Sequence, residues 1–499
     1  MSVSRREFLG TSAAAVGAAS LGLAWAGRSF AQDIADIRVA QIGFNGQGSG
    51  HIKANHANLV ALCDVDERVL ANKAREVEEK YGKKLETYTD FRKLLERQDV
   101  DAVSIATPNH THAWIAISAA QAGKHVYVEK PASHNIWEGR QMVQAARQFS
   151  RVMQCGTQSR SSSSLEDAVA YVRRGELGKI KYAIGTCYKP RPSIGKLDAA
   201  LEIPTSVDYD LWCGPAEKRD LYRPKLHYDW HWDFNTGNGD MGNQGIHQMD
   251  IARWFLGETT LAPRALSIGG RLGYDDAGDT PNSQIVYLDY PAAPLIFETR
   301  GLPRSKAGQR NWGGSMDRYR GTQIGVIVQC ERGYIYVPNY TSAEAYDPAG
   351  NQIKRWSVEG DALERHQMNW LAAVAANDPS RLNADIHEGH LSSSLCHLGG
   401  ISHRLGKPTR SAEIMDQTKA NDLLSSSFDR LASHLRANDV DIDDREEGVI
   451  TLGAWLELDP ATERFTGDGA DAANELRARQ QREPYLVPDL ERNTVAAAG

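Results

Sequence analysis

The chain has 499 residues, of which 41% are hydrophobic and 24% are charged, and its formal net charge is −7. This length and composition indicate a globular protein of two or three domains with an ample core. The negative balance and the lack of a basic stripe argue against nucleic-acid binding and against a Lys/Arg-rich membrane patch.

The first 31 residues have the features of an export signal. Arg5 and Arg6 form a twin-arginine motif, an apolar run of small residues extends from Thr11 to Ala26, and Ser29-Phe30-Ala31 offers a cleavage site. The run is short and rich in Ala and Gly for a membrane span. We therefore expect residues 1–31 to be a signal peptide read by the twin-arginine export machinery, which predicts a periplasmic or otherwise exported protein with no membrane span after cleavage. The alternative is an uncleaved N-terminal anchor.

The stretch that follows has the pattern of a dinucleotide-binding βαβ unit. An apolar strand leads from Ile37 into a glycine-rich turn, a helix and a second apolar strand. Gly43 permits the tight turn, Gly48 permits close packing of helix on strand, and the helix N-terminus offers N–H groups to a pyrophosphate. The usual second glycine is replaced by Asn45, which tolerates a positive φ better than most residues, and Gly46 follows it. A glycine-rich loop without a ligand is the alternative for the glycines alone.

Asp64, at the end of the second strand, indicates which nucleotide is bound. Its carboxylate would accept hydrogen bonds from the adenosine ribose hydroxyls and would repel a 2′-phosphate, so the sequence favours NAD over NADP. Twin-arginine export carries folded proteins, and free NAD is scarce outside the cytoplasm. We therefore expect the cofactor to be acquired before export and to be held tightly.

Strands and helices continue to alternate as far as residue 155, which predicts a doubly wound parallel sheet. Two segments follow strands of this sheet: Thr107-Pro108-Asn109-His110-Thr111-His112 and Glu129-Lys130-Pro131. Because ligands bind at the carboxyl ends of such strands, we expect both segments to flank the cofactor.

The glycine turn and these two segments occur in the order and spacing of the Gfo/Idh/MocA oxidoreductases, and the chain resembles this family over roughly residues 35 to 425. The resemblance implies a Rossmann domain followed by an α+β domain with an open, mostly antiparallel sheet. It also implies oxidation or reduction of sugars, inositols or related polyols with NAD(P). In such an enzyme Lys130 would lie beside the nicotinamide and the reacting carbon, and the Lys130–Pro131 bond would be cis.

The segment from Gly237 to Asp250 is similar to the second signature of the family, in which an Asp and a His face the substrate. His247 matches the histidine, but Asn243 stands where the aspartate is usual. An asparagine can bond a hydroxyl group but cannot accept a proton, which departs from a Lys–Asp–His relay. Lys130, His247 and Asn243 are the candidate catalytic residues, with Lys130 as the preferred proton acceptor.

The remaining candidates fall into two groups. Aromatic rings beside Asp and His suit a sugar ring, although the same cluster would also serve as a plug at a domain or subunit interface. The candidate substrate residues are Tyr188, Trp230, His231 and Trp232. The candidate cofactor residues are Gly43, Asn45, Gly46, Gly48, Asp64, Thr107, Pro108, Asn109, His112, Glu129 and Lys130. No C-x-x-C pair or His cluster with zinc spacing indicates a metal.

We divide the chain into a signal peptide (1–31), a Rossmann domain (35–155), a substrate-binding domain (156–410) and a C-terminal extension (411–499). In the third part, Lys179–Tyr188 and four later runs alternate as strands, and Leu391–Leu405 is expected to be a helix. The family resemblance implies that this helix returns to the Rossmann domain. In the extension, Pro484–Pro488 is expected to form an extended strap over a neighbouring surface.

Three functional hypotheses remain open. The first is an NAD(P)-dependent dehydrogenase acting on a secondary hydroxyl of a sugar, glycoside or polyol. The second uses tightly bound NAD without net oxidation, either as a glycosidase or lyase or as a sugar–sugar oxidoreductase. The third is a non-catalytic sugar-binding protein. A homo-oligomer, dimer or tetramer, is expected from the family resemblance.

Overall fold

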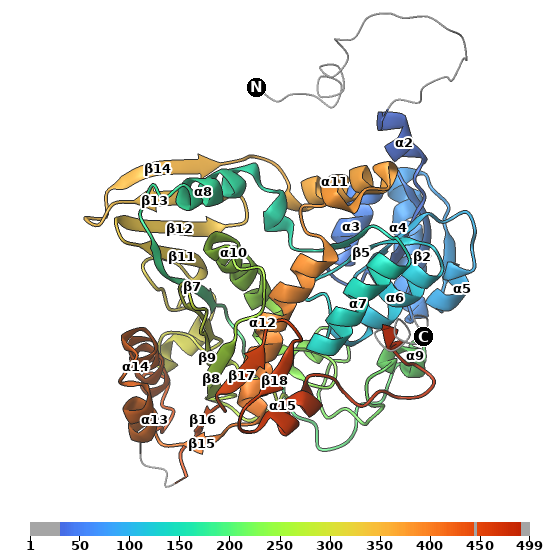
Figure 1. The fold of residues 1–499 in the computed structure, drawn as a ribbon. Helices are drawn as coiled ribbons and strands as arrows, with labels where there is room; N and C mark the ends of the chain where they lie inside the picture. The colour runs from blue at the N-terminus through green and yellow to red at the C-terminus, as the bar shows by residue number, and fades with distance from the viewer. Residues whose placement is uncertain (1–29, 444–446, 491–499) are drawn as a thin grey trace, which may run out of the picture.

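The computed structural model describes residues 30–443 and 447–490 (Figure 1). The twin-arginine motif and the apolar run of the predicted signal lie outside these residues. Within the described ranges, no helix has both the length and the apolar character needed to cross a membrane.

The first sheet is the predicted parallel Rossmann sheet. Its six strands lie in the order β3-β2-β1-β4-β5-β6, and every neighbouring pair is parallel. They are β1 (Val39–Ile42), β2 (Leu59–Cys63), β3 (Glu86–Tyr88), β4 (Ala102–Ile105), β5 (His125–Val128) and β6 (Met153–Cys155). The central strands are buried on both faces, which explains their continuous apolar sequences.

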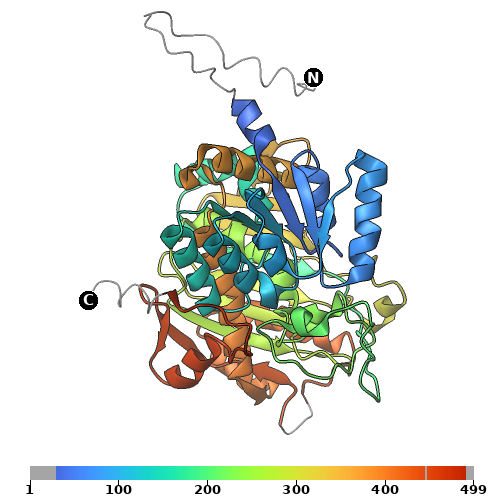
Figure 2. The same cartoon turned by 90° about the vertical axis from the view of Figure 1, so that its right-hand side faces the viewer.

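Helices cover both faces of this sheet (Figure 2). One face packs against α5 (Phe91–Leu95), α6 (His112–Gln121) and α7 (Ile136–Gln148). The other face packs against α2 (Phe30–Asp36), α3 (Gly48–Asn55), α4 (Glu67–Tyr81) and α11 (Ala362–Ala376). The last of these helices comes from far along the chain. Its Trp370 is fully buried with its ring centre 5.7 Å from that of Tyr127 on β5, so residues assigned to the substrate domain complete the Rossmann domain.

The second sheet is large and mostly antiparallel, as predicted. Ten strands follow the order β14-β13-β12-β11-β7-β10-β9-β8-β16-β15, and β17 pairs with β8 and β18. Among the described strands of this second sheet, β7 and β10 form the one parallel pair. They can do so because the chain leaves the sheet after β7 and re-enters it at β8. The strands are β7 (Ile180–Tyr188), β8 (Arg264–Gly270), β9 (Ser283–Leu288), β10 (Leu295–Arg300), β11 (Ile324–Cys330), β12 (Gly333–Asn339), β13 (Ser342–Tyr346), β14 (Gln352–Ser357), β15 (Lys407–Thr409), β16 (Ile450–Leu452), β17 (Leu456–Asp459) and β18 (Arg464–Thr466).

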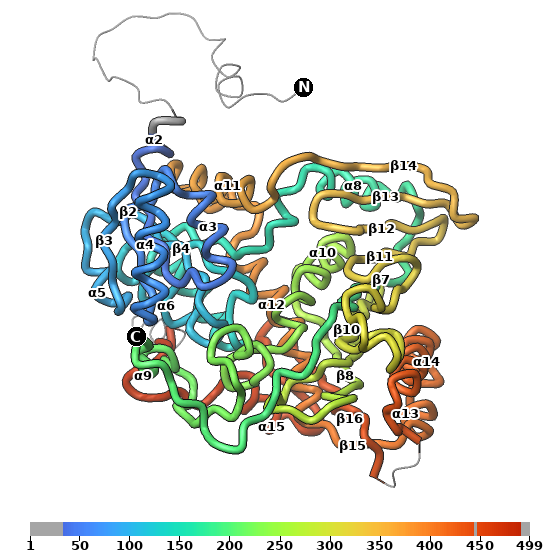
Figure 3. Tube along the Cα trace, turned by 180° about the vertical axis from the view of Figure 1, so that it is seen from behind, coloured from blue at the N-terminus to red at the C-terminus, as the bar shows by residue number. Residues whose placement is uncertain are grey.

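Helices also pack on both faces of the second sheet. The face toward the Rossmann domain carries α8 (Ser163–Arg173), α10 (Ile246–Leu256) and α12 (Ile386–Arg404). The opposite face is covered over β8, β9 and β10 by α13 (Ser411–Thr418) and α14 (Asp422–Arg436), as Figure 3 shows. As expected, α12 returns to the Rossmann domain and packs on α7 and β6.

The C-terminal extension is continuous with the second domain. Strand β16 pairs with β8, and β17 also pairs with β8, so residues beyond 410 add strands to the same sheet. After α15 (Ala470–Leu476), residues 477–490 form a strap that runs back over the Rossmann domain (Figure 1). In this strap the ring of Tyr485 lies 5.1 Å from that of Trp114 on α6, and the amide of Leu490 donates to Gln141 on α7. The predicted strap is therefore present, and it begins earlier than Pro484.

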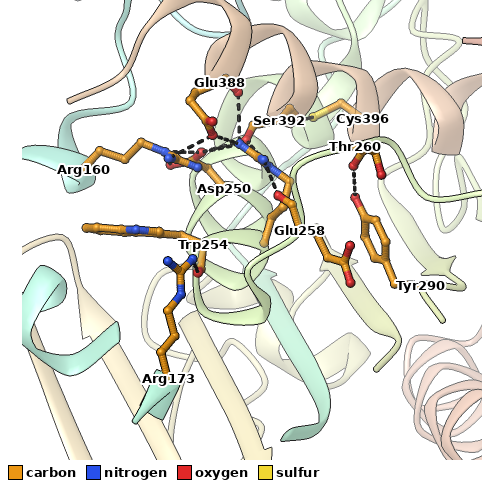
Figure 4. Close-up of polar contacts among 11 residues, drawn as sticks. Arg160, Arg173, Asp250, Trp254, Glu258, Thr260, Tyr290, Glu388, Ser392 and Cys396 are labelled. Carbon is orange, nitrogen blue, oxygen red and sulfur yellow. Dashed lines mark hydrogen bonds and ion pairs between the residues drawn. The ribbon is translucent and has the colours of Figure 1, made fainter. Parts of the chain in front are cut away.

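A buried ionic network fixes α10 and α12 against the short helix η2 (Gln158–Ser161), as Figure 4 shows. Arg160 donates to Asp250 at 2.8 Å and pairs with Glu388 at 3.0 Å. Ser392 donates to Asp250 at 2.7 Å and accepts from Arg253 at 3.1 Å. Each buried charge has an opposite charge and hydrogen bonds, which is the condition under which buried ions are tolerated.

Candidate active site

A cavity of about 540 Å³ opens at the carboxyl ends of β1, β2, β4 and β5. Most of the predicted site residues meet there although they are spread over two hundred positions of sequence. Those that line it are Gly43, Asn45, Gly46, Asp64, Thr107, Pro108, Asn109, His112, Glu129, Lys130, Trp230, His231 and Asn243. The rule that ligands bind at the carboxyl edge of a doubly wound sheet therefore located the cavity correctly.

The glycine turn is built to admit a phosphate. Gly43 has φ +75°, and a Cβ on Gly48 would lie 2.1 Å from the Gly43 carbonyl oxygen. Gly48 therefore acts from behind the cavity by letting α3 approach β1. A Cβ on Gly46 would meet nothing within 4 Å, so this position faces open space, and no side chain caps the N-terminus of α3. These features fit the pyrophosphate of a dinucleotide.

Asn45 occupies the turn without a left-handed backbone. The positive φ of this turn is confined to Gly43, while Asn45 lies exposed at the rim of the cavity. The argument that asparagine is tolerated here because it accepts a positive φ is therefore wrong. The substitution is compatible with the turn because the position does not require that conformation.

Asp64 lies at the cavity end of β2, where its carboxylate accepts weakly from the Phe44 amide at 3.4 Å and from the Asp66 amide at 3.0 Å. Burial raises the pKa of this carboxyl to about 6, and the two amide bonds only partly oppose the increase. Lys130 is the single Lys or Arg among the described residues that line the cavity. The Asp64 end therefore has no Lys or Arg on the cavity wall to pair with a 2′-phosphate.

The apolar wall of the cavity was not predicted from the sequence. Phe91, Trp114 and Ile115 from α5 and α6 line it, together with Leu211 from α9 (Tyr209–Cys213). The loop that carries α9 is tied down by Asp66, whose carboxylate accepts from Ser206 at 2.9 Å and from His227 at 3.1 Å. A segment of the second domain thus closes over the nucleotide side of the crevice. The cluster of aromatic residues around Tyr209 was the feature of the sequence that could have indicated this segment.

Lys130 lies at the end of β5 and joins the two domains. Its Nζ donates to the carbonyl oxygen of Asn243 at 2.7 Å, and the Lys130–Pro131 bond is cis, as expected. Burial lowers the pKa of Lys130, partly opposed by the charge of Glu129. His112 supports this turn from the side, with its ring nitrogens 2.8 Å from the Pro131 carbonyl and 2.7 Å from the Thr107 carbonyl.

Glu129 is a buried carboxylate with several hydrogen-bond donors. It accepts from His51 at 3.0 Å, from Gln158 at 3.2 Å and from the Lys130 amide at 3.0 Å. Burial alone would raise its pKa, but the bond from His51 and the nearby positive charges lower the pKa to about 2. The remaining His51 nitrogen lies 2.9 Å from the Ser104 hydroxyl. Glu129 therefore remains ionised and supplies a fixed negative charge next to Lys130.

Asn243 and His247 lie on either side of the start of α10. Asn243 belongs to a π-helical turn, η4 (Met241–Gly245), and contributes its backbone carbonyl to Lys130. His247 is buried against Tyr340, with ring centres 4.8 Å apart, and it does not line the cavity. Burial and the charge of Lys130 lower its pKa to about 3, so the imidazole is neutral.

Two of the four candidate substrate residues lie elsewhere. Tyr188 points to the opposite face of the second sheet, where its hydroxyl donates to Glu298 and Arg300 stacks on its ring. Neighbouring residues of a strand face opposite sides, so Cys187 lies in the core beneath α10 and Tyr188 does not. Trp232 is buried against Arg191. Neither Tyr188 nor Trp232 therefore lines the cavity, whereas Trp230 and His231 line it and stack with ring centres 3.6 Å apart.

The six cysteines are all buried and unpaired. In the described ranges, no group of three or more His, Cys, Asp or Glu side chains is arranged to hold a metal ion.

Comparison with known proteins agrees with this geometry. Residues 37–157 match the family model described as "Oxidoreductase family, NAD-binding Rossmann fold". Residues 188–297 match the model for the C-terminal alpha/beta domain of the same oxidoreductases. These two stretches are therefore similar to the two domains of the Gfo/Idh/MocA oxidoreductases.

Individual relatives are more distant. Levoglucosan dehydrogenase of Pseudarthrobacter phenanthrenivorans is 26% identical over 260 residues, which cover 49% of this chain and 59% of the relative. A glycosyl hydrolase family 109 protein of Shewanella pealeana is 36% identical over 118 residues, 22% of this chain and 26% of the relative. The matches therefore span less than two thirds of these curated relatives.

One solved structure illustrates the shared fold. The WlbA dehydrogenase of Bordetella pertussis, in complex with NADH and UDP-GlcNAcA, has a TM-score of 0.54 at 18% identity. The superposition covers 74% of this chain and 97% of that one. At this identity the likeness establishes the fold alone.

The raised pKa of Asp64 predicts that the affinity for NAD depends on pH. Because the carboxylate must be ionised to accept two ribose hydroxyl bonds, the affinity for NAD should be high above pH 6 and should fall as the pH drops through about 6. Titration of cofactor-free protein by calorimetry between pH 5 and 8 measures this. Asp64→Asn should bind more weakly and without the inflection. An inflection of the same size in Asp64→Asn would show that another group causes it.

Proposed function

We propose that the protein is an NAD-dependent dehydrogenase acting on a secondary hydroxyl of a sugar, glycoside or polyol. The observation that carries this proposal is the placement of Lys130. Its buried amine shares one cavity with the glycine turn and Asp64, and it is held across the domain boundary by the Asn243 carbonyl. The similarity to a levoglucosan dehydrogenase supports the substrate class.

The protein groups define a simple acid–base step. A bound nicotinamide would supply the hydride acceptor for the substrate C–H bond. Lys130 would take the hydroxyl proton in the same step, so that the alcohol becomes a carbonyl. Burial lowers its pKa, which makes the neutral amine more accessible than that of an exposed lysine. The Asn243 carbonyl orients Nζ, and the ionised Glu129 stabilises the ammonium that forms.

The aromatic side chains of Trp230 and His231 would orient the substrate. Trp230 presents a flat face at the cavity, and stacked His231 stiffens it. A sugar ring offers C–H faces to such a surface and hydroxyls to neighbouring polar groups such as the Asn109 and Asn243 side chains. His247 does not line the cavity. It is a buried neutral ring close enough to Lys130 for the lysine charge to lower the pKa of the imidazole.

We also propose that NAD is the cofactor and that it is held tightly. Asp64 disfavours a 2′-phosphate, and Lys130, at the other end of the cavity, is the one cationic side chain lining it in the described part of the chain. The loop bearing α9 closes over the nucleotide side and is anchored to Asp66. Such coverage slows release, which suits an enzyme exported with its cofactor already bound.

A second candidate is an NAD-using glycosidase, which oxidises a ring hydroxyl, eliminates the aglycone, adds water and reduces the ring again. The 36% identity to a glycosyl hydrolase family 109 protein favours it. Lys130 would serve the oxidation and the reduction in opposite directions.

Replacement of Lys130 tests the assignment of the proton acceptor. Lys130→Met removes the amine and keeps most of the side-chain volume, so kcat should fall by about 10²–10⁴-fold while NAD remains bound. Lys181→Met, at an exposed position on β7, is the control and should have wild-type turnover. Steady-state kinetics with NAD titration separate the two effects. Near-normal kcat in Lys130→Met would remove this residue from the mechanism.

Export with bound cofactor can be tested by fractionation. Protein purified from the exported fraction should release about one equivalent of NAD on denaturation, because the cofactor is acquired during folding inside the cell. Replacing Arg5 and Arg6 together by lysine should leave the protein in the cytoplasm, whereas replacing Lys80 and Lys84 by arginine should not. Exported wild-type protein free of nucleotide would contradict the tight-binding proposal.

The net reaction distinguishes the two candidates. A dehydrogenase presented with its substrate should convert bound NAD to NADH, seen as absorbance in a single turnover. A glycosidase should release aglycone from a chromogenic glycoside repeatedly with no accumulation of NADH. Multiple turnovers of glycoside at constant NAD would replace the first proposal with the second.

A further inference from the structure

A second cavity, of about 680 Å³, lies next to the active site. Its walls are the C-terminal half of α12, the loops at residues 217–219 and 234–238, and residues 476–482 at the start of the strap. The two cavities have separate linings on either side of η4. Met241 lines the second cavity, while Gly242 and Asn243 line the first.

Two buried imidazoles face this cavity without adequate hydrogen bonds. His134 and His397 are 9% and 5% exposed. Neither nitrogen of His134, nor Nε2 of His397, makes a hydrogen bond of good geometry in the described residues, although the backbone of Phe234 lies close to the first ring and that of Ser133 close to the second. Nδ1 of His397 has a long contact of 3.5 Å with Asn238. Burial lowers the pKa of both rings, that of His397 to about 3, so each is neutral with one N–H donor and one acceptor nitrogen. A hydroxyl group, which donates and accepts, matches such a ring.

The cavity is also rich in positive charge. Lys218, Arg219, Arg404, Arg479 and Arg482 line it, against the carboxylates of Glu217 and Asp279. Four of these cations are paired with carboxylates behind the wall: Lys218 and Arg482 with Asp210, Arg219 with Asp233, and Arg479 with Glu138.

Arg404 is the exception. In the described chain it has no carboxylate within ion-pair distance, and its guanidinium stands 5.5 Å from the centre of the Phe234 ring. Asp279 interacts with it electrostatically and, with a pKa raised by burial to about 6, is mostly ionised at neutral pH, but its carboxylate lies beyond ion-pair distance. Arg404 is thus available to pair with an anion entering the cavity.

We propose that this second cavity binds a small polyhydroxylated anion, a carboxylated or phosphorylated sugar or polyol, with Arg404 pairing its charge and His134 and His397 bonding its hydroxyls. The face of Phe234 would cover the C–H surface of the ligand. This site is separate from the dehydrogenase cavity, and its existence does not depend on the proposed reaction.

One side chain connects the two cavities. Asn238 accepts from Asn109 of the active cavity at 3.0 Å and donates to the His134 carbonyl at 3.0 Å. A Cβ on Gly242 would lie 2.7 Å from Cβ of Asn238, so η4 packs tightly on this residue. A ligand that contacts Asn238 from the second cavity therefore contacts the wall that holds Lys130.

Calorimetric titration of the full chain with its bound cofactor tests the proposal. The probes are D-gluconate and glucose 6-phosphate as the two anionic forms, D-glucitol as the uncharged match, and inorganic phosphate as the anion without hydroxyl groups on carbon. We expect one equivalent of at least one anionic polyol to bind, and D-glucitol and phosphate to bind more weakly. Preference between gluconate and the phosphate ester identifies the anionic group.

Variants assign the binding to a cavity. Arg404→Gln should weaken the anionic polyol by about tenfold, because a charge-assisted bond is lost. Arg355→Gln, on exposed β14, should leave the affinity unchanged. Lys130→Met should also leave it unchanged, since Lys130 lies in the other cavity.

Four outcomes would overturn the proposal. Wild-type affinity in Arg404→Gln would exclude the ion pair. Binding lost in Lys130→Met but retained in Arg404→Gln would place the ligand in the active cavity. A site for anionic polyols would be excluded if none of the probes bound saturably. It would also be excluded if D-glucitol bound as tightly as the anions.

Discussion

The hydrogen bond from Lys130 to the Asn243 carbonyl is the contact on which the site depends, because it spans the boundary between the two sheets. A buried amine has few ways to satisfy its hydrogen-bonding capacity, and its position is set by whichever acceptor lies within reach. The π-helical turn before α10 supplies that acceptor. Glu129 and the cis turn at Pro131 set the position from the other side. The two domains therefore cannot shift relative to each other without altering the environment of this amine.

The local rules of sequence reading were sufficient for the Rossmann half. Apolar strands such as β1 and β4 are buried on both faces, and each is followed by residues whose function requires an edge position. The edge of the sheet at which a ligand binds then followed from the parallel topology. The same reasoning predicts Lys130 and Asp64 at this edge, and the resemblance to the family's second signature adds Asn243; all three line the cavity.

The parts that could not be predicted depend on long-range packing. The amphipathic sequence of helix α11 predicts that Trp370 is buried. It does not predict that Trp370 packs against Tyr127 on β5. For Tyr188, the alternation of β7 predicts that it and Cys187 face opposite sides, but not which side faces the cavity. The apolar wall formed by Trp114 and Leu211 combines residues about a hundred positions apart, and no local signal joins them.

The two layers that complete the Rossmann domain have a consequence for how the chain matures. One face of its sheet is covered by α11, and the other is crossed by the strap of residues 477–490, with Tyr485 against Trp114. During synthesis the ribosome releases the first 155 residues long before either cover exists. The nascent domain must therefore wait, with part of its apolar surface open to solvent or chaperones, until residues 362–376 and 477–490 have been made. Final closure of the nucleotide-binding half thus follows the synthesis of the second domain.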